Sequence, residues 1–565
     1  MLESPDYIDT NIDKRGIDPL GNSFFIEALY RSAFPGINNV VQFIRIYSAV
    51  CWMVRNIDEH AAKKAARGQD VDIGELSRVG LEKIQLLLAW YNVKQGVKGL
   101  AGGGRIFPSG ATKVSVDTSK LVGSSDYNAL AYDPEHEPGK GAFFVQPDQY
   151  SPSLVNGMRF LMRTSISGAY ALTEAGNELA DGYELAVTDH PWRDWLANPE
   201  KLKASDVDVA EMGEMLDLRQ PSEFEIEAFV AQYYPEKDDT ATGPNWENRK
   251  QALTLVLRAV RAEMEAAKAA GQKGVTVDAI RHAMARGCAQ DGTPVDLEGS
   301  ETIQAWWQNL QLRQYFRAAQ ETLLRLSESW VHRAYQKDWS RDVSDCAAGV
   351  AQSLAATLPG YHRNIVRSLV DELESLCGDA PSLYAAGPSI GVESRIETLR
   401  AQLEKHAEFK HGSPEEGAAL RDSYIALIYC ACEAKNFEAS EDIVLHHPAE
   451  RFSPARLVAL VEEYMDQSPE QFMTHVVRHY VLLQHFRVVQ ERSDDGGNRF
   501  RLLKGDNGLE RMSQNVRLGE VRVLPDRLRH AVLLLSQCKL LTEPMEGYFK
   551  LAPEGLRRLR ALERV

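Results

Sequence analysis

The sequence has 565 residues, of which 44% are apolar and 25% are charged, and its formal net charge at pH 7 is −16. Such a length excludes a single hydrophobic core, and such a composition excludes a chain that is disordered throughout. The most apolar stretch, residues 40–54, is too short to cross a bilayer, and the acidic start lacks the basic residues and apolar run of a secretory signal, so we expect a cytoplasmic protein.

The first 190 residues are predicted to combine helices with a small, irregular β region. Apolar residues recur at helical spacing in residues 24–34 and 40–57, and Pro35-Gly36 supplies a turn between them, which predicts a helical hairpin. A helix over residues 73–93 leads into a Gly-rich stretch and an irregular β region that extends to residue 149. A helix over residues 153–164, a strand over 169–172 and a helix capped by Thr173 follow, in the order typical of a winged helix. We therefore predict one domain over residues 1–190.

Residues 191–470 have an almost wholly helical pattern. Apolar residues such as Leu253 and Val256, and then Leu312, Phe316 and Leu323, mark two amphipathic faces. Breaks rich in Pro and Gly separate further helices, which predicts two helical domains over residues 191–345 and 346–470. Three tryptophans are either core residues or anchors for partner proteins, and burial is the favoured interpretation: Trp306, Trp307 and Trp330.

Residues 471–565 are basic, whereas the rest of the chain is acidic. They contain 17 Lys or Arg against 11 Asp or Glu, about +6, which leaves 47 against 69 for residues 1–470, about −22. We expect a helix capped by Ser468 and running to about Val488, followed by a hairpin of residues 488–491 and 500–503. We then expect a helix over residues 525–538, a hairpin of residues 540–542 and 548–551, and a helix over residues 553–562. This order predicts a basic winged-helix-like domain.

Nine cations of this basic segment are predicted to contact the phosphates of a nucleic acid, because such contacts release counterions and position a wing or a recognition helix. The alternative is that they pair with the acidic body or with an acidic partner. The nine are Arg487, Arg492, Arg499, Arg501, Lys504, Arg527, Arg529, Arg557 and Arg558.

Two stretches could carry catalysis, and neither has the required order of residues. The Gly-rich residues 102–113 have five residues between Gly104 and Gly110 and place Lys113 after Thr112, so a flexible loop is favoured over a phosphate loop. Four carboxylates near Lys140 could hold the divalent cation of a nuclease, but the lysine precedes the apolar stretch and a solvated loop is favoured. The four are Asp126, Asp133, Glu135 and Glu137.

No cofactor or metal site is predicted from the histidines and cysteines. His475 and His479 share a helix face, but Val476 stands where a zinc protease has its Glu, so phosphate-contacting or other polar-face roles are favoured. The seven scattered cysteines are predicted to be reduced structural thiols.

Three stretches together resemble a set of uncharacterised bacterial proteins encoded beside phage-defence and restriction genes. They are residues 18–21 (Asp-Pro-Leu-Gly) with residues 34–40 and the aromatic helix that follows, residues 249–260, and residues 311–317. The resemblance covers about a fifth of the chain. It implies a biological setting, and it supplies no active site for particular residues here.

We therefore expect a mainly α-helical, multidomain protein with winged-helix-like modules. The expected function is that of a non-catalytic, nucleic-acid-binding or scaffold subunit of a multiprotein bacterial anti-phage defence complex, whose partners are DNA and other protein subunits, with homo-oligomerisation left open. The alternatives are a divergent metal-dependent nuclease and a structural subunit that binds only proteins. The sequence gives no means of choosing the partners or the trigger.

Overall fold

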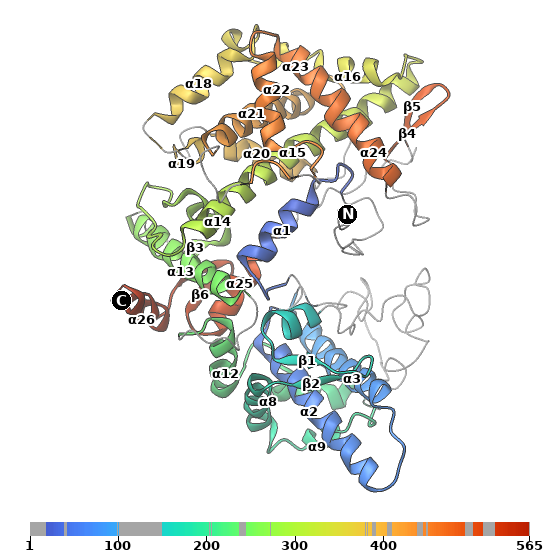
Figure 1. Cartoon of the computed structure of the whole chain (residues 1–565), viewed down its shortest axis with the longest axis vertical. Coiled ribbons are helices and arrows are strands. Elements are labelled where there is room, and N and C mark those ends of the chain that lie inside the picture. Colours follow the sequence, from blue (N-terminus) through green and yellow to red (C-terminus); the bar gives the residue numbers. More distant parts are fainter. Residues whose placement is uncertain are drawn as a thin grey trace, which may run out of the picture. The chain divides into compact units, whose positions relative to one another are not determined.

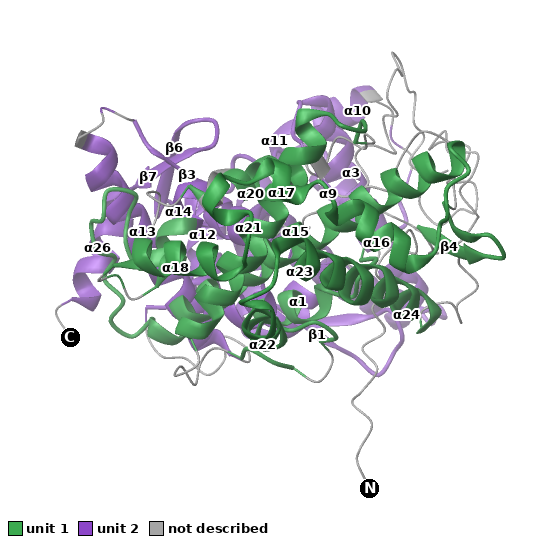
Figure 2. Cartoon of the chain, turned by 90° about the horizontal axis from the view of Figure 1, so that it is seen from above, with its two compact units in different colours: residues 1–29, 282–524 green, residues 30–281, 525–565 purple. Residues whose placement is uncertain are grey.

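The computed structural model confirms the mainly helical class, with 66% of residues in helices and 6% in strands. It describes residues 18–38, 42–98, 100, 150–202, 204, 206–236, 245–269, 271, 273–378, 380, 382–386, 391–403, 409–437, 444–447, 450–491, 501–511 and 526–563. The chain forms two compact units (Figure 2): unit 1 comprises residues 1–29 and 282–524, and unit 2 comprises residues 30–281 and 525–565. Residues 471–565, predicted as one domain, contribute to both units.

Unit 1 is built around the long helix α15 (Glu301–Gln336), which packs against α16 (Val343–Ala351), α20 (Val392–Leu403) and α21 (Pro414–Asn436) (Figure 1). Every residue of α15 from Asn309 to Val331 except Gln314 is buried. The helix therefore lies inside the unit, and its buried charges need partners: Arg317 Nε donates to Glu321 Oε1 over 2.6 Å. Burial is the favoured interpretation for three tryptophans: Trp307 and Trp330 are buried, whereas Trp306 is half-buried.

The remaining elements of unit 1 pack around α15 and α21, and the last two of them form a hairpin. Ser413, Ser453 and Ser468 each cap a helix that has proline at its first position, so the predicted cap at Ser468 is confirmed. The elements are α17 (Leu354–Thr357), the 3₁₀ turn η3 (Gly360–His362), α18 (Arg367–Cys377), α19 (Leu383–Ala386), α22 (Pro454–Tyr464), α23 (Pro469–Val476), the π-helix η5 (Val477–Leu482), α24 (Leu483–Glu491), β4 (Leu502–Gly505) and β5 (Gly508–Arg511).

The predicted hairpin of residues 488–491 and 500–503 is wrong. Residues 488–491 belong to α24, because Val488 and Val489 are buried at helical spacing after Gln484 and His485. The hairpin instead joins β4 to β5, with Gly505 opposite Gly508 across the residues Asp506 and Asn507.

Unit 2 has α2 (Ile44–Ala66) at its centre, packed against α3 (Ile73–Lys94), α8 (Glu174–Val187) and α12 (Glu223–Tyr233). All residues of α2 from Ile44 to Val54 are buried, and Arg45 forms a fully buried ion pair with Glu225 of α12, 2.7 Å between Nη2 and Oε2. The short segments are η1 (Pro152–Gly157), β1 (Leu161–Arg163), β2 (Tyr170–Leu172), α9 (Arg193–Ala197), α10 (Asp206–Glu211) and α11 (Gly213–Leu216). Helices α1 (Ser23–Ala33) and α14 (Val277–Arg286) each cross from one unit to the other.

The predicted strand over residues 169–172 and the Thr173 cap are confirmed, whereas the predicted helix over 153–164 is wrong. Thr173 Oγ1 accepts a hydrogen bond from Gly176 N at the start of α8, and β2 pairs with β1 antiparallel. Helical structure ends at Gly157, and Leu161 to Arg163 are extended because they form this ladder.

The last residues of unit 2 complete a sheet with a segment far away in the sequence. Helix α13 (Trp246–Ala269) precedes β3 (Val275–Thr276), and α25 (Leu528–Gln537) precedes the hairpin β6 (Leu541–Met545) and β7 (Tyr548–Leu551), which α26 (Pro553–Leu562) follows. The strand order is β3-β7-β6, with Val275 opposite Phe549 and Leu541 opposite Leu551. The predicted hairpin of residues 540–551 and the predicted last helix are confirmed.

Lys83 of α3 is fully buried and satisfies carbonyl groups at the end of α9. Its Nζ donates to the carbonyl oxygens of Trp195, Leu196 and Asn198 over 2.7, 3.1 and 2.9 Å, and burial lowers its pKa well below the usual range. Replacing Lys83 by methionine should lower the free energy of unfolding by about 2 kcal/mol in urea denaturation, because the buried acceptors lose their donor.

The matched control for Lys83 is Lys63→Met on the exposed face of α2, which should change the free energy of unfolding by less than about 0.5 kcal/mol. A Lys83→Met protein as stable as the original chain would show that the three carbonyl groups find other donors.

Candidate functional site: two polar cavities that share Gln352

Four of the nine cations predicted to contact nucleic acid have partners within their own unit. Arg501 is buried with its Nε 3.4 Å from Glu328 Oε1, and Arg527 donates to the carbonyl oxygen of Ile37 over 2.7 Å. Arg557 and Arg558 both pair with Glu554, and their hydrogen bonds are the main cause of a Glu554 pKa of about 2. These four guanidinium groups therefore have contacts within the protein, as in the alternative in which the cations pair with the acidic body.

Four of the nine are exposed: Arg557 on α26, which pairs with Glu554, and Arg487 on α24, Lys504 on β4 and Arg529 on α25. Arg487 and Lys504 belong to unit 1, whereas Arg529 belongs to unit 2. The other two, Arg492 and Arg499, lie outside the described residues, as do Asp126, Asp133, Glu135, Glu137 and the Gly-rich stretch 102–113.

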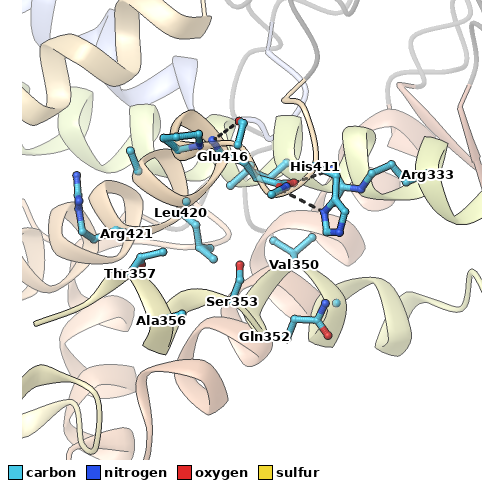
Figure 3. A pocket seen from close by; sticks show the side chains of 17 residues that line it. Arg333, Val350, Gln352, Ser353, Ala356, Thr357, His411, Glu416, Leu420 and Arg421 are labelled. Atoms are coloured by element: carbon cyan, nitrogen blue, oxygen red, sulfur yellow. Dashed lines mark hydrogen bonds and ion pairs between the residues drawn. The ribbon is translucent and has the colours of Figure 1, made fainter. Parts of the chain in front are cut away.

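A cavity of about 420 Å³ opens between the C-terminal half of α15, the end of α16, α17 and the start of α21 (Figure 3). At one end, Arg333 Nη1 donates to Glu416 Oε1 over 2.7 Å, and Glu416 Oε2 accepts from Gly412 N over 2.8 Å. His411 Nδ1 lies 3.4 Å from the same oxygen. Arg421 and Thr357 lie at the other end, away from Arg333 and His411 (Figure 3). The carboxylate of Glu416 therefore neutralises one cationic end of this cavity.

A second cavity, of about 530 Å³, lies beside the first in unit 1 and shares Gln352 with it. Its donors come from the turn between α22 and α23, from α23 and from the π-helix η5. They are Tyr464, Gln467, Ser468, Gln471, Thr474, His475, Arg478 and His479. A π-helical turn is rare and frequently marks a functional site.

His475 and His479 lie side by side in this second cavity, with ring centroids 4.5 Å apart, and Tyr464 Oη is 2.9 Å from His475 Nδ1. Burial lowers the pKa of both imidazoles, and the charges of Arg478 and Arg487 lower the pKa of His479 further. The rings are therefore mostly neutral at pH 7. Within the part of the chain that the structure describes, no three His, Cys, Asp or Glu side chains are grouped so that they could hold a metal ion.

The second cavity offers hydroxyl, amide, imidazole and guanidinium donors around one carboxylate, Glu470. Proteins use this set of groups to contact the phosphates and sugars of nucleic acids. Sequence reasoning identified His475 and His479 from their i, i+4 spacing but missed Gln352, Arg333 and His411. No local pattern joins those three residues, because the fold brings them together from three separate segments.

All seven cysteines are unpaired, five of them buried and two partly buried, in agreement with the prediction of structural thiols. No helix among the described residues has the length and apolar composition needed to span a bilayer. No protein-family model, no curated protein and no solved structure matches this chain.

Proposed function

We propose that this protein is a non-catalytic, nucleic-acid-binding scaffold subunit of a multiprotein bacterial anti-phage defence complex, and that the second cavity contacts the nucleic acid. The observation that carries the nucleic-acid part is the donor set of that cavity, which is the set used against phosphate and sugar. The defence setting rests on the resemblance of residues 18–21 and 34–40 with the aromatic helix that follows, of residues 249–260 and of residues 311–317.

The charge around the second cavity supports this proposal. Arg478 and Arg487 are exposed, and both act on the pKa of His479, so their guanidinium groups lie near that ring. Arg456 is exposed on α22, where its Nε donates to Tyr480 Oη over 2.9 Å. Three cations thus flank a cavity whose imidazoles are neutral, against the two carboxylates of Glu463 and Glu470, and this net positive charge suits contact with a phosphate backbone.

The scaffold part is supported by the topology of unit 2, which we interpret as a winged-helix-like core. Helix α13, strand β3 and the start of α14 precede residues 282–524, and α25 with the hairpin β6–β7 follows them, so that residues 282–524 are inserted into the core. The wing is formed by β6 and β7 and exposes Glu543, Met545, Glu546 and Lys550, a net charge of about −1, and within α25 only Arg529 is exposed. An acidic wing suits a protein partner better than a phosphate backbone.

Fluorescence anisotropy with labelled duplex and single-stranded DNA, at two or more salt concentrations, tests the nucleic-acid part. The full chain is used, because residues 471–565 are divided between the units. We expect salt-sensitive binding, and the double variant Arg478→Ala, Arg487→Ala should bind more weakly with a salt slope smaller by about 2. Arg67→Ala, which removes an exposed arginine at the end of α2 in unit 2, should leave binding unchanged.

Two outcomes would contradict this proposal in different ways. Absence of salt-sensitive DNA binding would favour a subunit that binds only proteins. Cleavage of DNA that requires Mg²⁺ or Mn²⁺ and is abolished by Asp133→Ala would favour the divergent nuclease.

A further inference from the structure

The end of α15 and the turn that follows it each expose an aromatic ring, Tyr335 and Trp339. Trp339 N donates to the carbonyl oxygen of Ala334 over 2.9 Å, and Asp338 has the left-handed φ of 52° that this type of helix end requires. The side chain of Tyr335 is 53% exposed and that of Trp339 is 44% exposed. Both belong to unit 1, and rings exposed to this extent four residues apart in the sequence are candidates for a contact surface.

These two rings are fixed in place. Lys337 Nζ lies 4.6 Å from the centroid of Trp339, and Arg341 Cζ lies 4.9 Å from the centroid of Tyr335. The buried ring of Trp330 is 6.5 Å from that of Trp339. The hairpin β4–β5 supports the turn from the other side, since Leu509 N donates to the carbonyl oxygen of Arg341 over 2.7 Å. A surface that is rigid before binding loses little conformational entropy when it is covered.

We infer that this surface binds a second copy of the chain. It comprises Tyr335, Lys337, Asp338, Trp339 and Arg341, and we call it the Tyr335–Arg341 surface. Tyrosine, tryptophan and arginine are the residues most enriched at the energetic centres of protein interfaces.

The charges of the Tyr335–Arg341 surface indicate which partner it fits. Lys337 and Arg341 are balanced by Asp338 and by Asp342, which is exposed at the start of α16. The four charges sum to about zero, so a polyanion would gain little from this surface. A twofold axis through the surface would instead bring the cations of one copy against the carboxylates of the other, which is the self-complementarity that a symmetric dimer requires.

Sedimentation velocity over a range of protein concentrations tests this inference. We expect a monomer–dimer equilibrium, and Tyr335→Ala and Trp339→Ala should each raise the dimer Kd by ~30-fold. The matched control is Tyr361→Ala in η3, which removes a ring that is 63% exposed elsewhere in unit 1 and should leave the dimer Kd unchanged. Trp339→Ala also removes the contact with Trp330. If that variant fails to fold, Tyr335→Ala alone tests the inference.

A pair of charge variants makes the test specific for this surface. Lys337→Glu with Arg341→Glu gives an acidic surface, and Asp338→Lys gives a basic one, so each variant alone should be monomeric and an equimolar mixture should form a heterodimer. A chain that is monomeric at every concentration would overturn the inference. A dimer that persists in both variants alone would overturn it as well, because the contact would then lie elsewhere.

Discussion

Replacing Arg249 by methionine is expected to lower the free energy of unfolding of unit 2 by about 4 kcal/mol. Arg249 is fully buried on α13, and its guanidinium donates to the carbonyl oxygens of Gln232, Tyr233, Pro35 and Gly157 over 2.8, 3.0, 3.0 and 3.3 Å. Burial lowers its pKa to about 10. Methionine fills the space without donating a hydrogen bond, so four acceptors would lose this donor, each at a cost of about 1 kcal/mol or more.

The backbone around Arg249 has little freedom to adapt to a smaller donor. A Cβ on Gly157 would lie 2.1 Å from the Cα of Gly36, and Gly36 itself has a φ of +82°. Two chain segments therefore cross in direct backbone contact, and the guanidinium binds both of them. Arg249→Lys keeps the charge but has fewer donors in a different geometry, so we expect it to lose about half as much stability as Arg249→Met.

Guanidinium denaturation followed by circular dichroism, with hydrogen exchange of the amides in α12 and α13, measures the Arg249 effect. Arg67→Met is the matched control, since Arg67 is exposed and its loss should change the free energy of unfolding by less than about 0.5 kcal/mol. If Arg249→Met retained the stability and the exchange rates of the original chain, the four hydrogen bonds would be shown to contribute nothing net.

The helices and the last hairpin were predictable because local signals determine them. Pro553 begins α26 and Gly547 supplies the left-handed residue of the β6–β7 turn, with a φ of +79°. The hairpin β4–β5 has an equally strong local signal, Asn507 followed by Gly508, which sequence reasoning overlooked in favour of a Ser-Asp-Asp-Gly-Gly-Asn turn at residues 493–498. The hairpin was therefore misplaced because two turn signals lie close together in the sequence.

The division into units was not predictable in the same way. Strand β3 has only two residues, too few for an alternating pattern, and its partner Phe549 follows Val275 by almost half the chain. Consecutive segments are usually neighbours in space, so sequence reasoning assigned residues 471–565 to one domain. Residues 282–524 separate β3 from α25 in the sequence, although both elements belong to unit 2.

The candidate site shows the same limit. The positive charge of residues 471–565 is readable from composition, but the partners of Arg501 and Arg558 are not, because Glu328 and Tyr234 lie far away in sequence. The i, i+4 spacing of His475 and His479 was readable because both lie on one continuous helical segment. The cavities themselves depend on how α15, α16, α21 and α23 pack, which no pattern within a single helix specifies.

Lowering the pH from 7 to 4 is expected to remove about 3 kcal/mol from the free energy of unfolding of unit 1 through one residue, His485. Its Nδ1 lies 3.0 Å from the carbonyl oxygen of Pro19, and its Nε2 accepts from Arg501 N over 3.2 Å. This arrangement requires a neutral ring with the proton on Nδ1, because a protonated Nε2 would face the Arg501 N–H. Burial is the main cause of the lowering of the pKa of His485 to about 4, and the charge of Arg501 adds to it.

The direction of the pH effect follows from the two protonation states. Between pH 6.5 and pH 4 the unfolded chain binds a proton at His485 and the folded chain does not, so protons stabilise the unfolded state. The stability contributed by the neutral ring is complete above pH 6.5. It then falls by about 1.4 kcal/mol for each pH unit until the folded-state pKa is reached.

Urea denaturation at pH 7, 6 and 5, compared between the original chain and His485→Gln, isolates this residue from the carboxylates that titrate in the same range. Glutamine can donate to Pro19 and accept from Arg501 without binding a proton. The free energy of unfolding of His485→Gln should therefore fall less steeply with decreasing pH than that of the original chain, by about 1.4 kcal/mol per pH unit. His479→Gln, which replaces a partly exposed ring, should reduce the pH dependence much less. Equal pH dependence in the original chain and His485→Gln would mean that the folded protein accommodates a charged ring at this position.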